Sequence, residues 1–258
     1  MSNIFYMGNA NVISREDAHQ TNMNTVPHNT VVGNTREPIT IFVVRARLKT
    51  AMHTLIKRKF KFGTRDRDGN TALHYAAEIG DMIVPLAPLC NLSIQNSLGY
   101  TPLAIAVMNQ HYDAVAFLKE AMYVKDLNGN GPIHYAIQLQ DVDMVKCLVK
   151  HSPKLRFSVY EAEEFHVNCF CNEDDKSPLR MAVDNMDEAM VKCLLDLGAE
   201  ATDMVKQGLV EKGKTEDTIR MYGTLFEDTN VHRNSKASSD SRTGLLSGRS
   251  DQDKYCLF

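Results

Sequence analysis

A short motif that occurs four times in the chain constrains its fold more than any other feature of the sequence. The copies begin at Asp66, Asn96, Asp126 and Asn172, so they start 30, 30 and 46 residues apart. Each copy begins with Asp or Asn and has Gly or Asp at its fourth position. Its sixth position is Thr, Ser or Gly, and its eighth is Leu or Ile. A recurring period of this length indicates repeated supersecondary units, which bury their apolar faces against their neighbours.

Each motif predicts a tight turn that is followed directly by a helix. The Asp or Asn side chain bonds to nearby backbone, and glycine tolerates a positive φ, so both favour a turn. Thr71, Thr101 and Ser177 are good helix N-caps, and in three copies a proline follows at a position where no N–H is required. We expect a first helix to begin there, with His74 and His134 hydrogen-bonded within the turn.

A second helix is predicted after each first helix. The pentamers Met144–Leu148 and Met190–Leu194 are identical and place apolar residues at helical spacing. In the first unit, Pro85 and Pro88 fall where this helix should run, so we expect it to be short, bent or started by a proline.

The turn between the two helices keeps a glycine only at Gly80. Asn109 and Asn185 lie beside the lost glycines of two later units. Asparagine visits the left-handed conformation more readily than most residues. We therefore expect these two asparagines to adopt it.

Four units of turn, helix, turn and helix in register resemble the ankyrin repeat, whose motif has the same Thr-Pro-Leu-His core. The resemblance implies an all-α fold, an ankyrin-repeat solenoid of stacked helix-turn-helix units with short β-turns or hairpins. It also implies that the turn tips and the exposed sides of the first helices form an extended concave surface for a protein partner.

We divide the chain into a repeat domain, residues 36–227, between two flanking segments. Residues 1–35 are rich in Asn and Thr and are expected to be flexible, without a core of their own, and residues 228–258 are expected to be a disordered tail. Within the domain we expect a degenerate N-terminal cap at 37–65, repeats at about 66–95, 96–125, 126–154 and 172–202, an insertion at 155–171, and C-terminal capping helices at 203–227.

The insertion 155–171 carries aromatic residues, among them Phe157, Tyr160 and Phe165. Insertions in repeat arrays emerge as loops, often on the binding face. Two interpretations remain open. The insertion is either a finger that contacts a partner or a loop that folds its rings back onto the stack.

Candidate catalytic and metal-binding residues are sparse. His166, Cys169 and Cys171 are of the residue types that bind zinc, but structural zinc wants four ligands and no second pair lies nearby. The chain has no Gly-rich phosphate loop and no coherent nucleophile with a base. We therefore predict no enzyme, with no catalytic residue, metal or cofactor, and keep metal-binding or catalytic activity in the insertion as the least favoured alternative.

Charge and composition narrow the classes of partner further. The net charge is −3, with acidic and basic residues mixed, which does not favour a nucleic-acid partner. No apolar run approaches the roughly 20 residues of a membrane span, and no feature indicates a small-molecule substrate. The six cysteines are thinly spread, as is typical of free thiols, so we expect a cytoplasmic or nuclear location, or both.

Each of two polar segments has a functional interpretation and a purely structural one. The basic run Lys57–Lys61 would steer the chain to the nucleus or to an acidic partner, but cations are also favoured near a helix C-terminus, and we prefer this plainer account. The run Ser238–Ser241 would be a phosphorylation site, and here we prefer a solvated tail.

The predicted partner surface is centred on the two middle repeats, where apolar side chains occupy positions expected to face water. Exposed apolar groups with a polar rim mark interaction sites, and Tyr is favoured at hot spots. The alternative is that these side chains are scattered surface residues, or that the N-terminal segment covers them. The residues predicted to bind are Arg67, Asp68, Asn70, Glu78, Leu98, Tyr100, Met108, Asn109, Leu127, Asn128, Asn130, Gln138, Leu139 and Lys176.

The resemblance therefore predicts a non-catalytic protein-protein interaction module that serves in signalling as an adaptor, scaffold or inhibitor. One alternative is an inhibitor of a transcription factor, similar to the ankyrin-type inhibitors that retain such factors in the cytoplasm. Delivery of partners to a ubiquitin ligase is less favoured, because the tail has no recognisable ligase-docking box.

Overall fold

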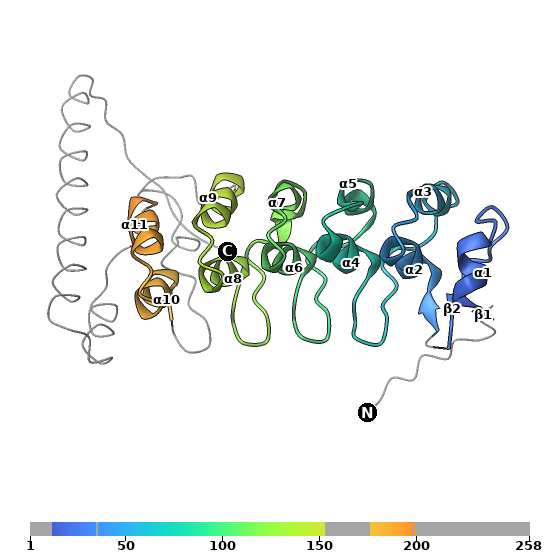
Figure 1. Cartoon of the computed structure of the whole chain (residues 1–258), viewed down its shortest axis with the longest axis horizontal. Coiled ribbons are helices and arrows are strands. Elements are labelled where there is room, and N and C mark those ends of the chain that lie inside the picture. The colour runs from blue at the N-terminus through green and yellow to red at the C-terminus, as the bar shows by residue number, and fades with distance from the viewer. Residues whose placement is uncertain (1–11, 35, 153–175, 198, 200–258) are drawn as a thin grey trace, which may run out of the picture. The chain divides into compact units, whose positions relative to one another are not determined.

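The computed structural model describes residues 12–34, 36–152, 176–197 and 199. From α2 onward the helices of these residues occur in pairs, and Figure 1 shows successive pairs side by side, with the first helices in one layer and the second helices in another. The first helices are α2 (Ile39–Arg45), α4 (Ala72–Ile79), α6 (Pro102–Met108), α8 (Pro132–Gln138) and α10 (Pro178–Asp184). The second helices are α3 (Lys49–Lys57), α5 (Ile83–Leu86), α7 (Tyr112–Leu118), α9 (Val142–His151) and α11 (Glu188–Asp196). The predicted all-α solenoid of helix-turn-helix units is confirmed.

The residues predicted to start the first helices do so. Thr71, Thr101 and Ser177 are the N-caps of α4, α6 and α10, and prolines begin α6, α8 and α10. His74 and His134 accept through Nδ1 the backbone N–H of the cap residue three positions earlier, each at 3.0 Å. Turn, cap and helix therefore form one hydrogen-bonded unit in these repeats, as the motif predicts.

Small residues let neighbouring repeats pack closely. Helix α2 contacts α4, and the series continues through α6 and α8 to α10, while α5, α7, α9 and α11 form the parallel series of second helices. The alanines at the contacts of the first helices have no exposed surface, namely Ala76, Ala77, Ala106, Ala136 and Ala182. Because such side chains fill little space, neighbouring first helices approach each other closely.

The second helix of the first matched unit is short, as its prolines predict. Helix α5 has four residues and runs directly into a 3-10 turn, η1 (Ala87–Leu89). Proline lacks the N–H that would continue the α-helical ladder and clashes with the preceding turn. The second helix of the next unit also tightens into a 3-10 turn, η2 (Lys119–Ala121).

The prediction that Asn109 and Asn185 adopt the left-handed conformation between the two helices was wrong. Asn109 and Asn185 have φ of −98° and −80°, and the left-handed residues are the next ones, Gln110 and Met186, with φ of 58° and 59°. The asparagine N–H groups still donate to helix carbonyls, so both asparagines belong to the helix ends. The bond from His111 N to the carbonyl of Ala106, 2.9 Å, closes the left-handed helix cap one residue later than predicted.

The expectation that residues 1–35 are flexible does not hold for residues 12–34. Strand β2 (Val31–Val32) pairs in parallel with β1 (Val12–Ile13) and antiparallel with β3 (Glu37–Pro38), and α1 (Arg15–Gln20) follows β1. Several apolar side chains of this segment are buried, among them Ala18, Met23 and Val26. A guanidinium N–H of Arg58 donates to the carbonyls of Met23 and Val26, at 2.7 and 2.6 Å, and so ties the segment to the end of α3.

Other predictions fall on residues that the structure does not describe. They are the N-terminal residues 1–11, the insertion 155–171, the capping helices 203–227 and the tail 228–258. Among the described residues, no helix is both long enough and apolar enough to cross a bilayer.

Candidate partner-binding surface

Three turns of one design project from the layer of first helices, each just before α4, α6 or α8 (Figure 1). In the first, Oδ1 of Asp66 accepts the backbone N–H groups of Asp68 and Asn70, at 3.0 and 2.8 Å. Asn96 and Asp126 make the same two bonds in their own turns. Each turn is therefore fixed from within by its leading side chain.

Hydrogen bonds also join each turn to the next. The backbone N–H of Ser97 donates to the carbonyl of Asp68 at 2.9 Å, and the Asn96 amide donates to Asn70 Oδ1 at 2.9 Å. One turn further, Nε2 of Gln95 donates to the carbonyl of Lys125 at 2.8 Å. The tips thus form a pre-ordered row, which would reduce the conformational entropy that is lost when a partner binds.

Two leucines on adjacent turns are the most exposed of the predicted apolar contacts. Leu98 is 61% exposed and Leu127 is 65% exposed. Leu127 lies over the glycine that follows Leu98, since a methyl group on Gly99 would be 3.0 Å from its Cγ. The two side chains therefore project from turns that pack against each other. Leu139, at the end of α8, is also exposed.

The expectation that Tyr100 and Met108 face water holds only in part, because both are half-buried. The ring of Tyr100 meets the ring of Tyr135 edge-on, with centroids 5.7 Å apart. Tyr135 is itself buried and donates its hydroxyl to Asp126. Tyr100 therefore holds two repeats together, and its exposed side alone is available to a partner.

The remaining predicted residues fall into two groups. Arg67, Asp68, Glu78, Asn109, Asn128 and Gln138 are exposed, whereas Asn70, Asn130 and Lys176 are half-buried. Lys176 lies 3.7 Å from the carboxylate of Asp184, so its charge is partly engaged within its own repeat.

Tyr75, on α4, is the main residue that the sequence analysis missed. It lines three hollows along the exposed sides of the first helices, with volumes of about 400, 230 and 520 Å³. Its hydroxyl donates to Oδ2 of Asp66 at 2.6 Å, and burial and this bond raise its pKa to about 12. Helical spacing was the signal that could have found it, because Tyr75 precedes the predicted contact Glu78 by three residues and shares its face.

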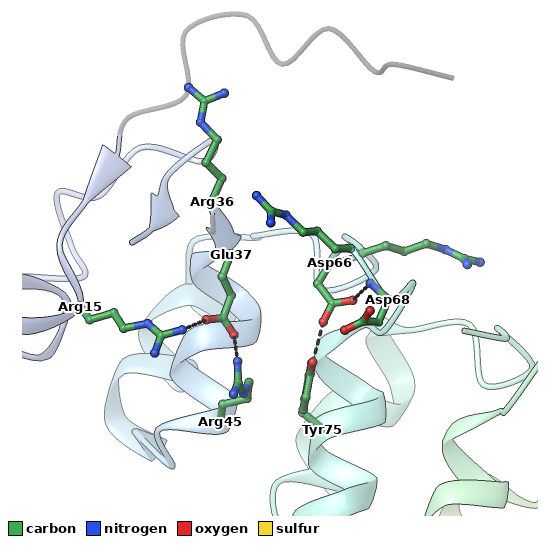
Figure 2. A pocket seen from close by; sticks show the side chains of 9 residues that line it. Arg15, Arg36, Glu37, Arg45, Asp66, Asp68 and Tyr75 are labelled. Atoms are coloured by element: carbon green, nitrogen blue, oxygen red, sulfur yellow. Dashed lines mark hydrogen bonds and ion pairs between the residues drawn. The ribbon is translucent and has the colours of Figure 1, made fainter. Parts of the chain in front are cut away.

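Several arginines line the first of these hollows (Figure 2). Arg45 donates to Oε1 of Glu37 at 2.9 Å, and Arg15 approaches the second oxygen of the same carboxylate at 4.0 Å. The Arg45 guanidinium also lies over the ring of Tyr75, 5.1 Å from its centroid. Its pKa is raised further by the bond to Glu37, and its position is fixed from two sides.

Among the described residues, a metal-binding cluster or a reactive thiol would be a sign of chemistry. No three His, Cys, Asp or Glu side chains among them converge as a metal site. Cys147 and Cys193 occupy equivalent positions of α9 and α11, and burial raises the pKa of both thiols, which disfavours the reactive thiolate. The predicted metal-type residues His166, Cys169 and Cys171 lie outside the described residues.

Comparison with known proteins matches this arrangement to one family. The family model for ankyrin repeats (3 copies) matches residues 40–126 and 118–205. Rabankyrin-5 of Mus musculus and of Homo sapiens are each 26% identical to this chain over 167 residues. The match covers 62% of this chain but only 13% of either relative, so the similarity is to a small part of those longer proteins.

Proposed function

The chain belongs to the ankyrin-repeat family, and from this premise we propose that it is a non-catalytic module that binds a protein partner on its turn tips and first helices. Ankyrin repeats generally mediate protein-protein interaction. The proposed surface comprises residues 66–70, 96–100 and 126–130 together with the exposed sides of α4 and α6.

The exposed pair Leu98 and Leu127 carries this proposal. Two large apolar side chains on adjacent turns lose contact with water when a partner covers them, which favours association by about 25 cal/mol for each square ångström buried. The bonded turns hold the pair in place before the partner arrives. The same row of turns carries the exposed polar residues Arg67, Asp68 and Asn128, as expected for the rim of an interface.

The proposal also covers the role of this module within the cell. We assign the module to an adaptor, a scaffold or an inhibitor that acts in the cytoplasm, the nucleus or both. Inhibition of a transcription factor is one form that such binding would take. A family that is typically non-catalytic supports the absence of an enzymatic role.

Affinity capture from native lysate, with variants of matched hydrophobicity, tests the proposal. The test variant is Leu98→Ser with Leu127→Ser. The control is Val84→Ser with Phe117→Ser, which alters two exposed residues on the second helices, 57% and 44% exposed. Tyr100 is left intact because its ring packs between repeats.

A partner that the wild type and the control retain, and that the folded test variant loses, would support the proposal. Retention by the test variant and loss by the control would move the binding surface to the second helices. Circular dichroism of each variant establishes that it is folded before its result is used.

A further inference from the structure

The N-terminal end of the proposed surface carries an excess of positive charge. Five arginines line the hollow of about 400 Å³, namely Arg15, Arg36, Arg45, Arg65 and Arg67. Three acids line it too, Glu37, Asp66 and Asp68, which leaves a net charge of about +2 at this end. The whole chain has a net charge of −3, so this end differs in sign from the rest.

Two of the three acids already use their oxygens within the protein. Glu37 is 7% exposed at its side chain and faces Arg15 and Arg45. Asp66 accepts two backbone N–H groups of its turn and the hydroxyl of Tyr75. These carboxylates therefore hold the hollow together and offer little to a cationic ligand. Figure 2 shows Arg15 and Arg45 both directed at the carboxylate of Glu37, and Tyr75 directed at Asp66.

The other arginines of the hollow, Arg36, Arg65 and Arg67, are less engaged in bonds within the protein. The side chains of Arg36 and Arg67 are exposed and make no hydrogen bond or ion pair with the residues that the structure describes. Figure 2 shows Arg36 extending away from Glu37. Arg65 uses one N–H on the carbonyl of Gln95 at 2.8 Å. The described part of the chain therefore leaves most guanidinium N–H donors of Arg36, Arg65 and Arg67 available to a ligand.

We infer that this arginine hollow takes an acidic segment of the protein partner, with Asp and Glu side chains placed between Arg36, Arg65 and Arg67. Guanidinium groups present a planar fork that matches a carboxylate with two parallel hydrogen bonds. Arg45, which lines the same hollow and is held in place by Glu37 and Tyr75, adds positive charge without reorganisation. This inference rests on the proposed function, since it names the chemistry that the partner brings to one end of the same surface.

Fluorescence anisotropy of a labelled hexaglutamate peptide with the full chain at 50 mM NaCl tests it. The test variant is Arg36→Ala with Arg67→Ala, and the charge-matched control is Lys150→Ala with Lys192→Ala, exposed on α9 and α11. We expect the test variant to bind about tenfold more weakly and the control to bind within about twofold of wild type.

Two further variants separate a shaped site from general attraction. Asp68→Asn removes a like charge beside the hollow and should tighten binding by about threefold. Arg36→Lys with Arg67→Lys keeps the charge but loses the planar fork, so its affinity should fall between wild type and the alanine variant.

Several outcomes would overturn the inference. They are the absence of peptide binding to the wild type, equal losses in the test and control variants, and equally tight binding of an oligothymidylate of the same charge. None of them bears on Leu98 and Leu127. A chain that loses its partner with the serine variants but ignores hexaglutamate would keep the proposed function and reject the acidic segment.

Discussion

The Nε2 atom of His74 lies 3.1 Å from the backbone carbonyl oxygen of Tyr100, across the boundary between two repeats. On the other side of the ring, Nδ1 accepts the backbone N–H of Thr71 at 3.0 Å. Nδ1 is therefore unprotonated, and the single ring proton sits on Nε2, which donates to Tyr100. The neutral histidine satisfies its own turn and the next one at once.

Lowering the pH should destabilise the repeat stack through His74. Burial is the main reason that the pKa of His74 is lowered to about 4, whereas an unfolded histidine has about 6.5. The unfolded state then binds more protons between these values, so stability is complete above about pH 6.5 and falls as the pH is lowered towards 4. We expect His74 to lower the free energy of unfolding by about 2 kcal/mol between pH 7.5 and pH 5.

Urea unfolding of His74→Asn at both pH values checks this. The variant should be less stable at pH 7.5 but should lose about 2 kcal/mol less than wild type on going to pH 5. His53→Asn, at an exposed position of α3, should keep the wild-type dependence. The same pH dependence in wild type and His74→Asn would contradict the assignment.

Gly99 should tolerate no side chain. Its φ is +81°, and a Cβ atom there would lie 2.7 Å from the backbone nitrogen of Leu127 in the next turn. Gly99→Ala should therefore lower the free energy of unfolding by about 2 kcal/mol or more, from left-handed strain and the clash with backbone. Gly63→Ala is the control, since a Cβ there meets no atom within 4 Å. Equal thermal unfolding of the two variants would show that the turns are not packed together as described.

Replacing a left-handed residue between the helices with glycine should stabilise the protein. Gln110 has a φ of 58°, where glycine is less strained. Gln110→Gly should raise the free energy of unfolding by about 0.5–1 kcal/mol. Its neighbour Asn109 has a φ of −98° and belongs to the helix end, so Asn109→Gly should lower it instead. Changes of the same sign in both variants, measured in urea, would contradict the placement of the turn.

Signals that act within a few residues predicted the fold well. The caps Thr71, Thr101 and Ser177 and the short α5 depend on bonds and clashes inside one unit, so the local sequence contains the information. The left-handed position was wrong by one residue because the helix closes with a bond from His111 to Ala106, which outweighs the preference of asparagine.

The candidate site was predicted less completely, because exposure depends on residues far away in the chain. Tyr100 looked exposed by its place in the motif, but its ring packs against Tyr135 from the next repeat. Tyr75 was missed because its importance comes from the hollows that three first helices enclose together. Residues 12–34 looked flexible because nothing in their composition reveals that Arg58 binds their carbonyls.

Arg58 should control the order of that N-terminal segment. Its Nη1 donates to the carbonyls of Met23 and Val26, and a hydrogen bond from a charged group contributes about 1.5–3 kcal/mol. Arg58→Met should therefore speed amide hydrogen exchange within residues 22–34 by about tenfold or more. Lys57→Met, one position earlier and exposed, should leave exchange there unchanged. Unchanged protection in Arg58→Met would mean that burial alone holds the segment.

Photo-crosslinking shows whether a partner covers the turn tips. The photoreactive residue p-benzoylphenylalanine replaces Leu127 in one protein and Phe117, exposed on α7, in another. Both proteins are irradiated in native lysate under the same conditions. We predict a covalent adduct of a single partner from position 127 and none from position 117. An adduct from position 117 alone would place the partner on the second helices and contradict the account.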